Sequence, residues 1–436
     1  MVYNIARCFT PRFDNKKQLF LSILASPKPF GAFFTQTTTT LWKTLRLAWF
    51  AFRRWEMNLP LGYQQFHKES FFNYQMNRLH ALGYARQADI EKAAGRIKTR
   101  ADYVQAFTRL ATEAKADGRS KNAAFYLRAA EFFAEHNSPQ RKAIYQEFHE
   151  TFYEAFANEG ITRHEVPYNG SFLPAMEPEA AVQPTKGTIL LFGGFDSLIE
   201  EFFVIWKFFA QAGYRVIAFE GPGQGGARQL YGHAFDHDYE KPIGAILDYF
   251  TIEAATLIGI SMGGYWDIRA AAYEDRIKQV VAWSPVYDWL EQVPGFVQAL
   301  VRQLVKFEGF MNATIRLRMR LFPILDHAVN QAMYMVKKDQ PMDAVRWLLG
   351  MNKQHISSDK VTQDVLLVGG ENDSFQPVKL LRKQEKALTN ARSVTTKIFT
   401  KDQHADMHCQ MGNLMLAMSE IEAWIREKQV QTRAVI

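Results

Sequence analysis

Cysteine is nearly absent from this sequence: its 436 residues contain only Cys8 and Cys409, which lie far apart. Two such residues match neither a zinc-binding pattern nor a disulfide framework, so the sequence excludes a small disulfide-stapled domain and a zinc ribbon. A low cysteine content is typical of proteins in a reducing compartment. We therefore expect a cytoplasmic location.

Long apolar runs and long blocks of like charge are also missing. No run reaches the ~18 apolar residues that a membrane-spanning helix needs. The net charge is +7, but the basic residues are dispersed, so we expect no nucleic-acid partner. In contrast, 47% of the residues are hydrophobic and 14% are aromatic, enough to build a large core.

The first 60 residues form a basic, aromatic N-terminal extension whose role the sequence leaves open. Residues 16–25 resemble a weak signal peptide, but their apolar stretch is short and Asp14 lies in a long leading segment. Residues 41–55 are aromatic and cationic, so a helix there could contact an anionic membrane surface. Apolar residues surround most of that helix, which favours packing against the rest of the protein.

Helical periodicity dominates residues 61–165, which we interpret as a helical N-terminal domain. Apolar residues recur at helical spacing over Ala123–Phe133 and Ile144–Phe156, and Ser138-Pro139 marks a turn between them. The stretch from Pro167 to Gly187 is rich in proline and glycine, and we interpret it as the domain boundary.

Beyond that boundary, short apolar runs alternate with helical segments, which predicts an α/β fold with a mostly parallel sheet. The alternation spans residues 185–285 and 361–430, and a helical insertion over 286–360, placed to act as a lid, separates the two parts. The predicted strands are Thr188–Phe192, Arg215–Phe219, Ala255–Ile260, Gln279–Trp283, Asp364–Val368 and Thr395–Phe399. The predicted helices of the insertion are Phe296–Leu304, Ala313–Leu321, His327–Met335 and Met342–Leu349.

Ser261 lies in a G-x-S-x-G sequence directly after the predicted strand at Ala255–Ile260. This arrangement is typical of a nucleophile elbow, a strained turn between a strand and a helix that exposes the serine. Small residues are required two positions before and after the serine, and here they are Gly259 and Gly263. Ser261 is therefore the candidate nucleophile.

A serine nucleophile needs a histidine base and a carboxylate that orients the base. Where the serine lies in a nucleophile elbow, the three follow in the chain order Ser, acid, His. Asp373 follows the strand predicted at Asp364–Val368 and is the candidate acid, with Glu371 as the alternative. His404 and His408 both follow the last predicted strand, and spacing alone does not separate them. We prefer His408 because it lies closer to the final predicted helix, over residues 412–425.

The oxyanion of such a reaction needs two backbone donors. One is the amide that follows the nucleophile, here Met262. The second comes from the turn after the first strand of the core, where Gly193-Gly194 allows amides to face inward and Phe195 is our choice.

Two further patterns could indicate other chemistry. Residues 221–226 match G-x-G-x-x-G, but the preceding Glu220 would repel a pyrophosphate, so we interpret the stretch as a turn rather than a dinucleotide site. His233 and His237 are four residues apart, as are the two candidate bases, but neither pair carries the Glu of H-E-x-x-H. We therefore expect no metal and no cofactor.

At residues 192–197, 220–225, 261–265 and 408–410 the chain resembles the α/β-hydrolase superfamily. More narrowly, it is similar to a branch that holds FrsA-like esterases, fungal pigment-pathway hydrolases that shorten a polyketide chain, and pseudooxynicotine-type carbon–carbon hydrolases. The resemblance covers roughly residues 65–430. The branch has histidine followed by Cys-Gln at the catalytic position, which strengthens the choice of His408 over His404.

The resemblance implies a serine esterase or a hydrolase of carbon–carbon bonds next to ketones that needs no cofactor. The implied substrate is a small molecule, and the aromatic residues near the lid would suit an aromatic or polyketide-like one. Candidate substrate contacts are Gly194, Asp288 and Trp289, although a surface or hinge role is favoured for Asp288 and Glu291. An acyltransferase using the same triad, and a non-catalytic binding protein, remain alternatives. A homodimer formed through the N-terminal helices is a further expectation, which only the family resemblance supports.

Overall fold

The computed structural model describes residues 57–179, 186–293 and 295–434. The N-terminal extension lies almost entirely outside these residues, and so does the segment 41–55 that we consider for membrane contact. Across the described ranges, no helix combines the length and the apolar character needed to cross a bilayer.

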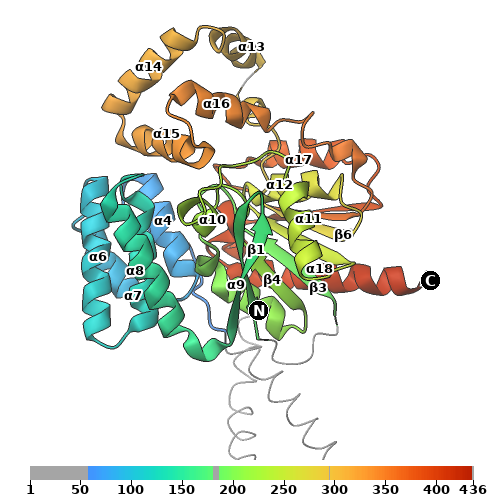
Figure 1. The fold of residues 1–436 in the computed structure, drawn as a ribbon, viewed down its shortest axis with the longest axis horizontal. Helices are drawn as coiled ribbons and strands as arrows, with labels where there is room; N and C mark the ends of the chain where they lie inside the picture. Colours follow the sequence, from blue (N-terminus) through green and yellow to red (C-terminus); the bar gives the residue numbers. More distant parts are fainter. Residues whose placement is uncertain (1–56, 180–185, 294, 435–436) are drawn as a thin grey trace, which may run out of the picture. The chain divides into compact units, whose positions relative to one another are not determined.

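The first described elements are five helices that precede the sheet (Figure 1). Their starts follow from local sequence: Thr99 and Asp102 form a capping box at α6, and Ser138 caps α8 with Pro139 in its first turn. Helix α7 is buried over Ala123–Phe133 because it packs between α6 and α8. These helices are α4 (Ser70–Ala81), α5 (Gln87–Ala94), α6 (Arg100–Ala116), α7 (Ser120–Phe133) and α8 (Pro139–Ala155).

An eight-stranded sheet follows, with the order β1-β2-β4-β3-β5-β6-β7-β8. All six strands predicted from the sequence are present, and together they form its parallel part. Each residue of β5 is buried, as expected for a parallel strand covered on both faces. The parallel strands are β3 (Thr188–Phe192), β4 (Arg215–Phe219), β5 (Ala255–Ile260), β6 (Ile277–Trp283), β7 (Asp364–Gly370) and β8 (Ser393–Phe399).

The remaining two strands form an antiparallel hairpin that the sequence analysis missed. Strand β1 (Ile161–Tyr168) pairs with β2 (Ser171–Pro178) around the turn Asn169-Gly170, where φ is 46° and 76°. Positive φ at both central residues is the geometry of a tight hairpin turn. The segment interpreted as a boundary therefore contains β2, and the division of the chain into domains stays a prediction.

The prolines that suggested a boundary are compatible with this hairpin. Strand β1 lies at the edge of the sheet, where Pro167 needs no second partner strand. Strand β2 pairs with β4 only through Ala175 and Met176, so the missing amides of Pro174 and Pro178 break no bond there.

Two apolar cores lie on opposite faces of the sheet. Alternate residues of β3 belong to different cores, Ile189 to one and Leu190 to the other, because successive strand side chains point to opposite faces. One face is covered by α9 (Phe203–Gln211), α18 (Leu414–Ala434) and the N-terminal helices, and the other by α11 (Glu240–Tyr249), α12 (Gly263–Ala271) and α17 (Val378–Ala387).

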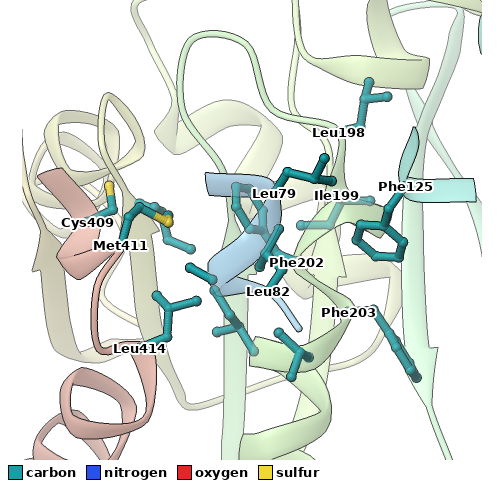
Figure 2. Close-up of a cluster of buried hydrophobic side chains, with 14 of the residues drawn as sticks. Leu79, Leu82, Phe125, Leu198, Ile199, Phe202, Phe203, Cys409, Met411 and Leu414 are labelled. Carbon is teal, nitrogen blue, oxygen red and sulfur yellow. The ribbon is translucent and has the colours of Figure 1, made fainter. Parts of the chain in front are cut away.

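The N-terminal helices share their core with the sheet. Figure 2 shows Leu79 and Leu82, at the end of α4, among side chains from the loop after β3 and from the start of α18. Phe202 and Leu414 are 2% and 1% exposed there, so this contact excludes water. Helix α4 is therefore fixed beside the loop that follows β3, which positions it next to the site described below.

The helical insertion lies between β6 and β7, where the sequence predicts it. It contains α13 (Gly295–Leu304), α14 (Glu308–Leu321), α15 (Pro323–Val336) and α16 (Pro341–Gly350). Proline stands in the first turn of both α15 and α16, where its missing amide breaks no helical bond.

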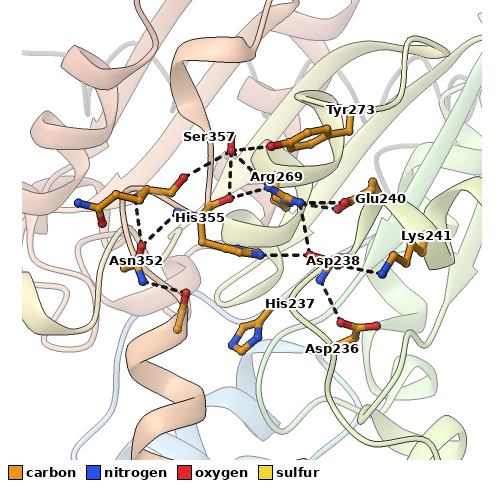
Figure 3. A network of polar contacts seen from close by, with 12 residues as sticks. Asp236, His237, Asp238, Glu240, Lys241, Arg269, Tyr273, Asn352, His355 and Ser357 are labelled. Atoms are coloured by element: carbon orange, nitrogen blue, oxygen red, sulfur yellow. Dashed lines mark hydrogen bonds and ion pairs between the residues drawn. The ribbon is translucent and has the colours of Figure 1, made fainter.

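A polar network fixes the segment that leads from the insertion back to the sheet (Figure 3). Arg269 of α12 binds Glu240 at 2.9 Å and donates to the His355 carbonyl at 2.9 Å. The His355 ring contacts Asp238 at 3.2 Å, and Ser357 bonds the Tyr273 hydroxyl at 2.9 Å. The insertion is therefore anchored at its C-terminal end by charged groups on the helices that cover the sheet.

Candidate active site

Ser261 lies in the turn between β5 and α12 with a φ of 60°, in the left-handed region. Its amide donates to the Trp283 carbonyl at 2.7 Å, which ties the turn to the neighbouring strand. A Cβ on Gly259 would approach the Gly263 carbonyl oxygen to 2.2 Å, and one on Gly263 would approach the Gly193 oxygen to 2.7 Å. Close backbone packing therefore explains why glycine stands on both sides of the serine.

The structure brings Ser261, His408 and Asp373 together from three separate loops. Nε2 of His408 lies 2.9 Å from Ser261 Oγ, and its Nδ1 lies 2.7 Å from Asp373 Oδ2. The other carboxylate oxygen of Asp373 accepts the amides of Phe375 and Gln376 at 2.9 and 2.8 Å. Asp373 is thus held in place by its own loop while it orients the imidazole.

The two alternatives considered on the sequence lie elsewhere. His404 is exposed on the turn after β8. Glu371 is also exposed, and its carboxylate accepts the Lys401 amide at 2.7 Å.

The electrostatics of His408 suit a base. Burial by itself would lower the pKa of His408, but the Asp373 carboxylate and Cys409 together outweigh burial and hold that pKa well above its ordinary value. His408 is 6% exposed. In the neutral tautomer that donates Nδ1–H to Asp373, Nε2 accepts the proton of the Ser261 hydroxyl.

The loop after β3 lies directly against the nucleophile turn. A Cβ on Gly194 would come within 2.9 Å of Ser261 Cβ and 3.0 Å of the Met262 nitrogen. Within the described ranges, neither the Met262 nor the Phe195 amide donates to another protein group. Both candidate oxyanion donors therefore have unused N–H groups, and they belong to the two turns that meet at Gly194 and Ser261.

Gln224 holds this loop, and the sequence analysis missed it. Its Nε2 donates to the carbonyls of Gly193 at 2.6 Å and Gly194 at 3.1 Å, and its Oε1 accepts the Gly221 amide at 2.9 Å. Gln224 is 1% exposed. In the sequence, the only sign of this role is that Gln224 is an amide side chain among the glycines of residues 221–226, which we interpret as a turn.

The glycines at 221–226 serve packing. A Cβ on Gly221 would reach 2.0 Å from the Tyr239 hydroxyl. Glu220 is buried and accepts the amides of Ile199 at 2.9 Å and Gly226 at 2.5 Å. Burial, with Glu200 nearby, raises the pKa of Glu220 to about 8. Glu220 thus occupies the amides of Ile199 and Gly226, so these donors are not available to a phosphate, which agrees with the interpretation as a turn.

Helix α4 and the insertion helices enclose a cavity of about 380 Å³ above Ser261 and His408. Gly194 and Trp289, two candidate substrate contacts, line it. Its apolar wall includes Phe71, Phe132, Phe195, Phe202, Trp289, Leu348 and Phe375, and its polar groups include Gln75, Arg78, His327 and Gln331. Burial, with Arg100 and Arg141 nearby, lowers the pKa of His327 to about 3, so this ring is neutral.

Asp288, the third candidate contact, is not among the residues that line the cavity. Its carboxylate accepts the amides of Leu290 at 2.8 Å and Lys353 at 3.2 Å, so it caps a turn and joins the two ends of the insertion. Glu291 pairs with Lys353 and Lys383 at the surface. The structure therefore corrects the expectation of substrate contact by Asp288, whose carboxylate binds backbone amides instead.

Buried ion pairs join the loop after β3 to the N-terminal helices. Arg78 of α4 binds Asp196 at 2.9 Å, and Arg128 of α7 donates to the Asp196 carbonyl at 2.6 Å. Glu201 pairs with both arginines. Burial would raise the pKa of Asp196, but Arg78 and Arg128 hold it below its ordinary value. The sequence did not reveal these pairs because the partners are 118 and 68 positions apart.

The histidines at 233 and 237 are not brought into a metal site. His237 donates from Nε2 to the Trp347 carbonyl at 2.8 Å. Over the part of the chain that the structure describes, no group of three His, Cys, Asp or Glu side chains is arranged to hold a metal ion.

In a comparison with protein families, the alpha/beta hydrolase fold family matches residues 187–407, just over half of the chain. Among curated proteins, hydrolyase poxO of Penicillium oxalicum is 34% identical over 122 residues, 25% of this chain and 29% of that protein. Hydrolase ORFZ of Pyricularia oryzae is 31% identical over 179 residues, 36% of this chain and 42% of that protein. The chain thus spans less than half the length of these curated relatives.

Solved structures share the fold. The crystal structure of 2,6-dihydroxy-pseudo-oxynicotine hydrolase matches with a TM-score of 0.56 and 20% identity, over 80% of this chain and 95% of that one. AbyA5 matches with a TM-score of 0.58 and 18% identity, over 79% of this chain and 95% of that one. Likeness at this identity concerns architecture alone, and the predicted fold class is confirmed.

Proposed function

Because the chain belongs to the α/β-hydrolase fold family, we propose that it is a serine hydrolase in which Ser261 is the nucleophile, His408 the base and Asp373 the orienting acid. The family membership confirms the resemblance drawn from the sequence motifs. The observation that carries the proposal is the continuous contact from Ser261 Oγ through His408 to Asp373, at 2.9 and 2.7 Å.

The proposed reaction follows from this geometry. His408 Nε2 takes the hydroxyl proton while Ser261 Oγ attacks a substrate carbonyl, and the resulting oxyanion accepts the amides of Met262 and Phe195. The tetrahedral intermediate collapses to an acyl-enzyme, and His408 returns the proton to the leaving group. Water then attacks the acyl-enzyme with His408 as its base, which releases the acid and restores Ser261.

The bond that breaks is an ester or a carbon–carbon bond next to a ketone. An ester releases an alcohol or a phenol. A β-diketone releases an enolate, which His408 protonates, so both reactions use the same groups. Transfer of the acyl group to a bound alcohol instead of water would use the same intermediate.

The cavity supports a small, largely apolar substrate that is aromatic or polyketide-like. Its volume of about 380 Å³ is in the range of small-molecule sites. Neutral His327, together with Gln75 and Gln331, offers hydrogen bonds to oxygen atoms of such a substrate away from the scissile carbonyl. The insertion over 286–360 acts as the lid, because α15 and α16 supply part of the cavity wall.

Steady-state turnover tests the proposal. The purified chain is given short-chain p-nitrophenyl esters and an aromatic β-diketone, with Ser261→Ala and with Ser358→Ala as a control for loss of a buried serine outside the site. We expect turnover of at least one substrate class, lost by ~10³-fold or more in Ser261→Ala and retained in Ser358→Ala. Turnover that survives in Ser261→Ala refutes the proposal, and binding without turnover of either class favours a binding protein.

Three related proposals need separate tests. A cytoplasmic location is tested by fractionation of cells that express the chain. Sedimentation analysis tests a homodimer through the N-terminal helices. The division into domains is tested by limited proteolysis, which should cut between residues 165 and 185 and at the two ends of the lid.

A further inference from the structure

Large apolar side chains are exposed along α13 and α14, the helices of the insertion that lie farthest from the sheet (Figure 1). In a single stretch, Phe296 is 78% exposed, Phe307 63%, Phe310 64%, Leu317 58% and Leu321 65%. Several large apolar side chains exposed on consecutive helices of a folded protein mark a site of interaction with another apolar surface.

On α14 these residues share one face. Phe310, Leu317 and Leu321 are spaced by seven and four residues, which places them along one line of a helix that turns ~100° per residue. Met319, the one buried residue of α14, lies on the opposite face. The helix thus packs on the rest of the insertion through one side and presents its apolar side outward.

Positive charge borders this face. Arg318 and Arg320 lie ~80° to either side of its centre and are exposed. Arg302 and Lys306 add exposed cations on the preceding segment, and among the described residues none of these four forms an ion pair. The only acid within residues 295–322 is Glu308, which pairs with Arg346 at 2.8 Å.

We propose that the α13–α14 face docks on a membrane surface rich in anionic phospholipid. An apolar strip flanked by cations matches the boundary between acyl chains and phosphate headgroups, where arginine stems lie along apolar groups and their guanidinium groups reach the phosphates. A second copy of the chain is a poor occupant, because an isologous contact would set the same rows of cations against each other.

The position of this face relative to the cavity gives the docking a role. Helix α14 continues through Phe322 into α15, whose His327, Ala328, Gln331 and Ala332 line the cavity. A membrane contact on α13–α14 therefore places the lid against the bilayer, from which an apolar substrate can enter. Docking itself needs no turnover, so its test is independent of the proposed hydrolytic function.

Co-sedimentation with vesicles tests the docking on the full chain. The vesicles contain phosphatidylcholine alone or equal parts of phosphatidylcholine and phosphatidylglycerol. One test variant removes the apolar strip (Phe310→Asp with Leu317→Asp) and a second reverses its flanking charge (Arg318→Glu with Arg320→Glu). The matched controls are Val430→Asp, which replaces a side chain that is 63% exposed on α18, and Arg96→Glu with Lys98→Glu on exposed loop positions.

We expect the chain and both controls to sediment with the anionic vesicles and to be released by high salt. Each of the two test variants should lower the partition onto anionic vesicles by at least about tenfold, since the first removes two exposed apolar side chains from the contact and the second replaces two cations by anions. Retained circular dichroism and thermal unfolding show that a variant is folded. Sedimentation unchanged in both test variants overturns the proposal, because the binding then resides elsewhere, for example in residues 41–55. A dimer in solution that only the test variants dissociate also overturns it, since a second copy then covers the face.

Discussion

Replacing Gln224 by leucine should displace the loop after β3, which carries the candidate oxyanion donor Phe195, relative to the triad. The substitution keeps the volume of a side chain that is 1% exposed, but it removes donors to the Gly193 and Gly194 carbonyls and the acceptor of the Gly221 amide. Each buried group left without a partner costs about 1–3 kcal/mol, so the loop after β3 is expected to move to recover bonds. That movement carries the Phe195 amide away from the oxyanion.

Loss of one oxyanion donor costs ~10²–10³ in kcat, about 2.7–4 kcal/mol. We expect Gln224→Leu to approach that loss in kcat with little change in KM, because the cavity wall is retained. The assay is the initial rate of p-nitrophenyl ester hydrolysis over a range of substrate concentrations, with thermal unfolding measured in parallel.

A matched control separates this effect from general destabilisation. Gln279 is also a buried glutamine, and it bonds Thr256 at 2.8 Å and the Ile425 carbonyl at 3.2 Å, away from the cavity. Gln279→Leu should lower the unfolding temperature by a similar amount and leave kcat within a few-fold. If Gln224→Leu reduces kcat no more than Gln279→Leu does, or if it acts on KM alone, the assigned role of Gln224 is wrong.

Three further predictions concern charge. The acid limb of kcat/KM should lie above pH 6.5, because Asp373 and Cys409 together outweigh burial and raise the pKa of His408, and only neutral His408 acts as base. Asp373→Asn should move the limb to lower pH, and an unmoved limb contradicts this. Arg128→Met should cost about 1–3 kcal/mol in urea unfolding, because Glu131 and Glu201 each lose one of their two arginine partners, and an unchanged unfolding free energy would exclude that cause. Since the pKa of Glu220 is raised to about 8, the folded chain loses stability as the pH rises from 5 to 8. Glu220→Gln should therefore gain up to about 4 kcal/mol relative to the parent over this range, and a constant difference in unfolding free energy would contradict it.

The parallel strands and the nucleophile turn could be predicted because each depends on adjacent residues. An apolar run such as Ala255–Ile260 indicates a strand that is buried on both faces. The glycines two positions before and after Ser261 indicate close contact between backbone segments. The order of Ser261, Asp373 and His408 along the chain then followed from the order that accompanies a nucleophile elbow. Because His404 and His408 follow the same strand, the choice of His408 depended on its closeness to the final predicted helix, and the family resemblance strengthened it.

The features that could not be predicted from the sequence depend on contacts between residues far apart in the chain. The β1–β2 hairpin was missed because proline normally ends a strand, and only the sheet order shows that these prolines need no partner. The role of Gln224 depends on the loop after β3, which lies 30 positions earlier. The candidate role of Asp288 failed for a similar reason, since its carboxylate is used by the amide of Lys353, 65 positions later.

The most direct test of the central claim is covalent labelling of the purified chain with a fluorophosphonate, followed by mass spectrometry of the peptides. An activated Ser261 should carry the adduct, and labelling should be lost in Ser261→Ala and His408→Ala but retained in His404→Ala, where the exposed alternative histidine is removed. An adduct at another residue, or labelling of Ser261 at an undiminished rate in folded His408→Ala, would contradict the account.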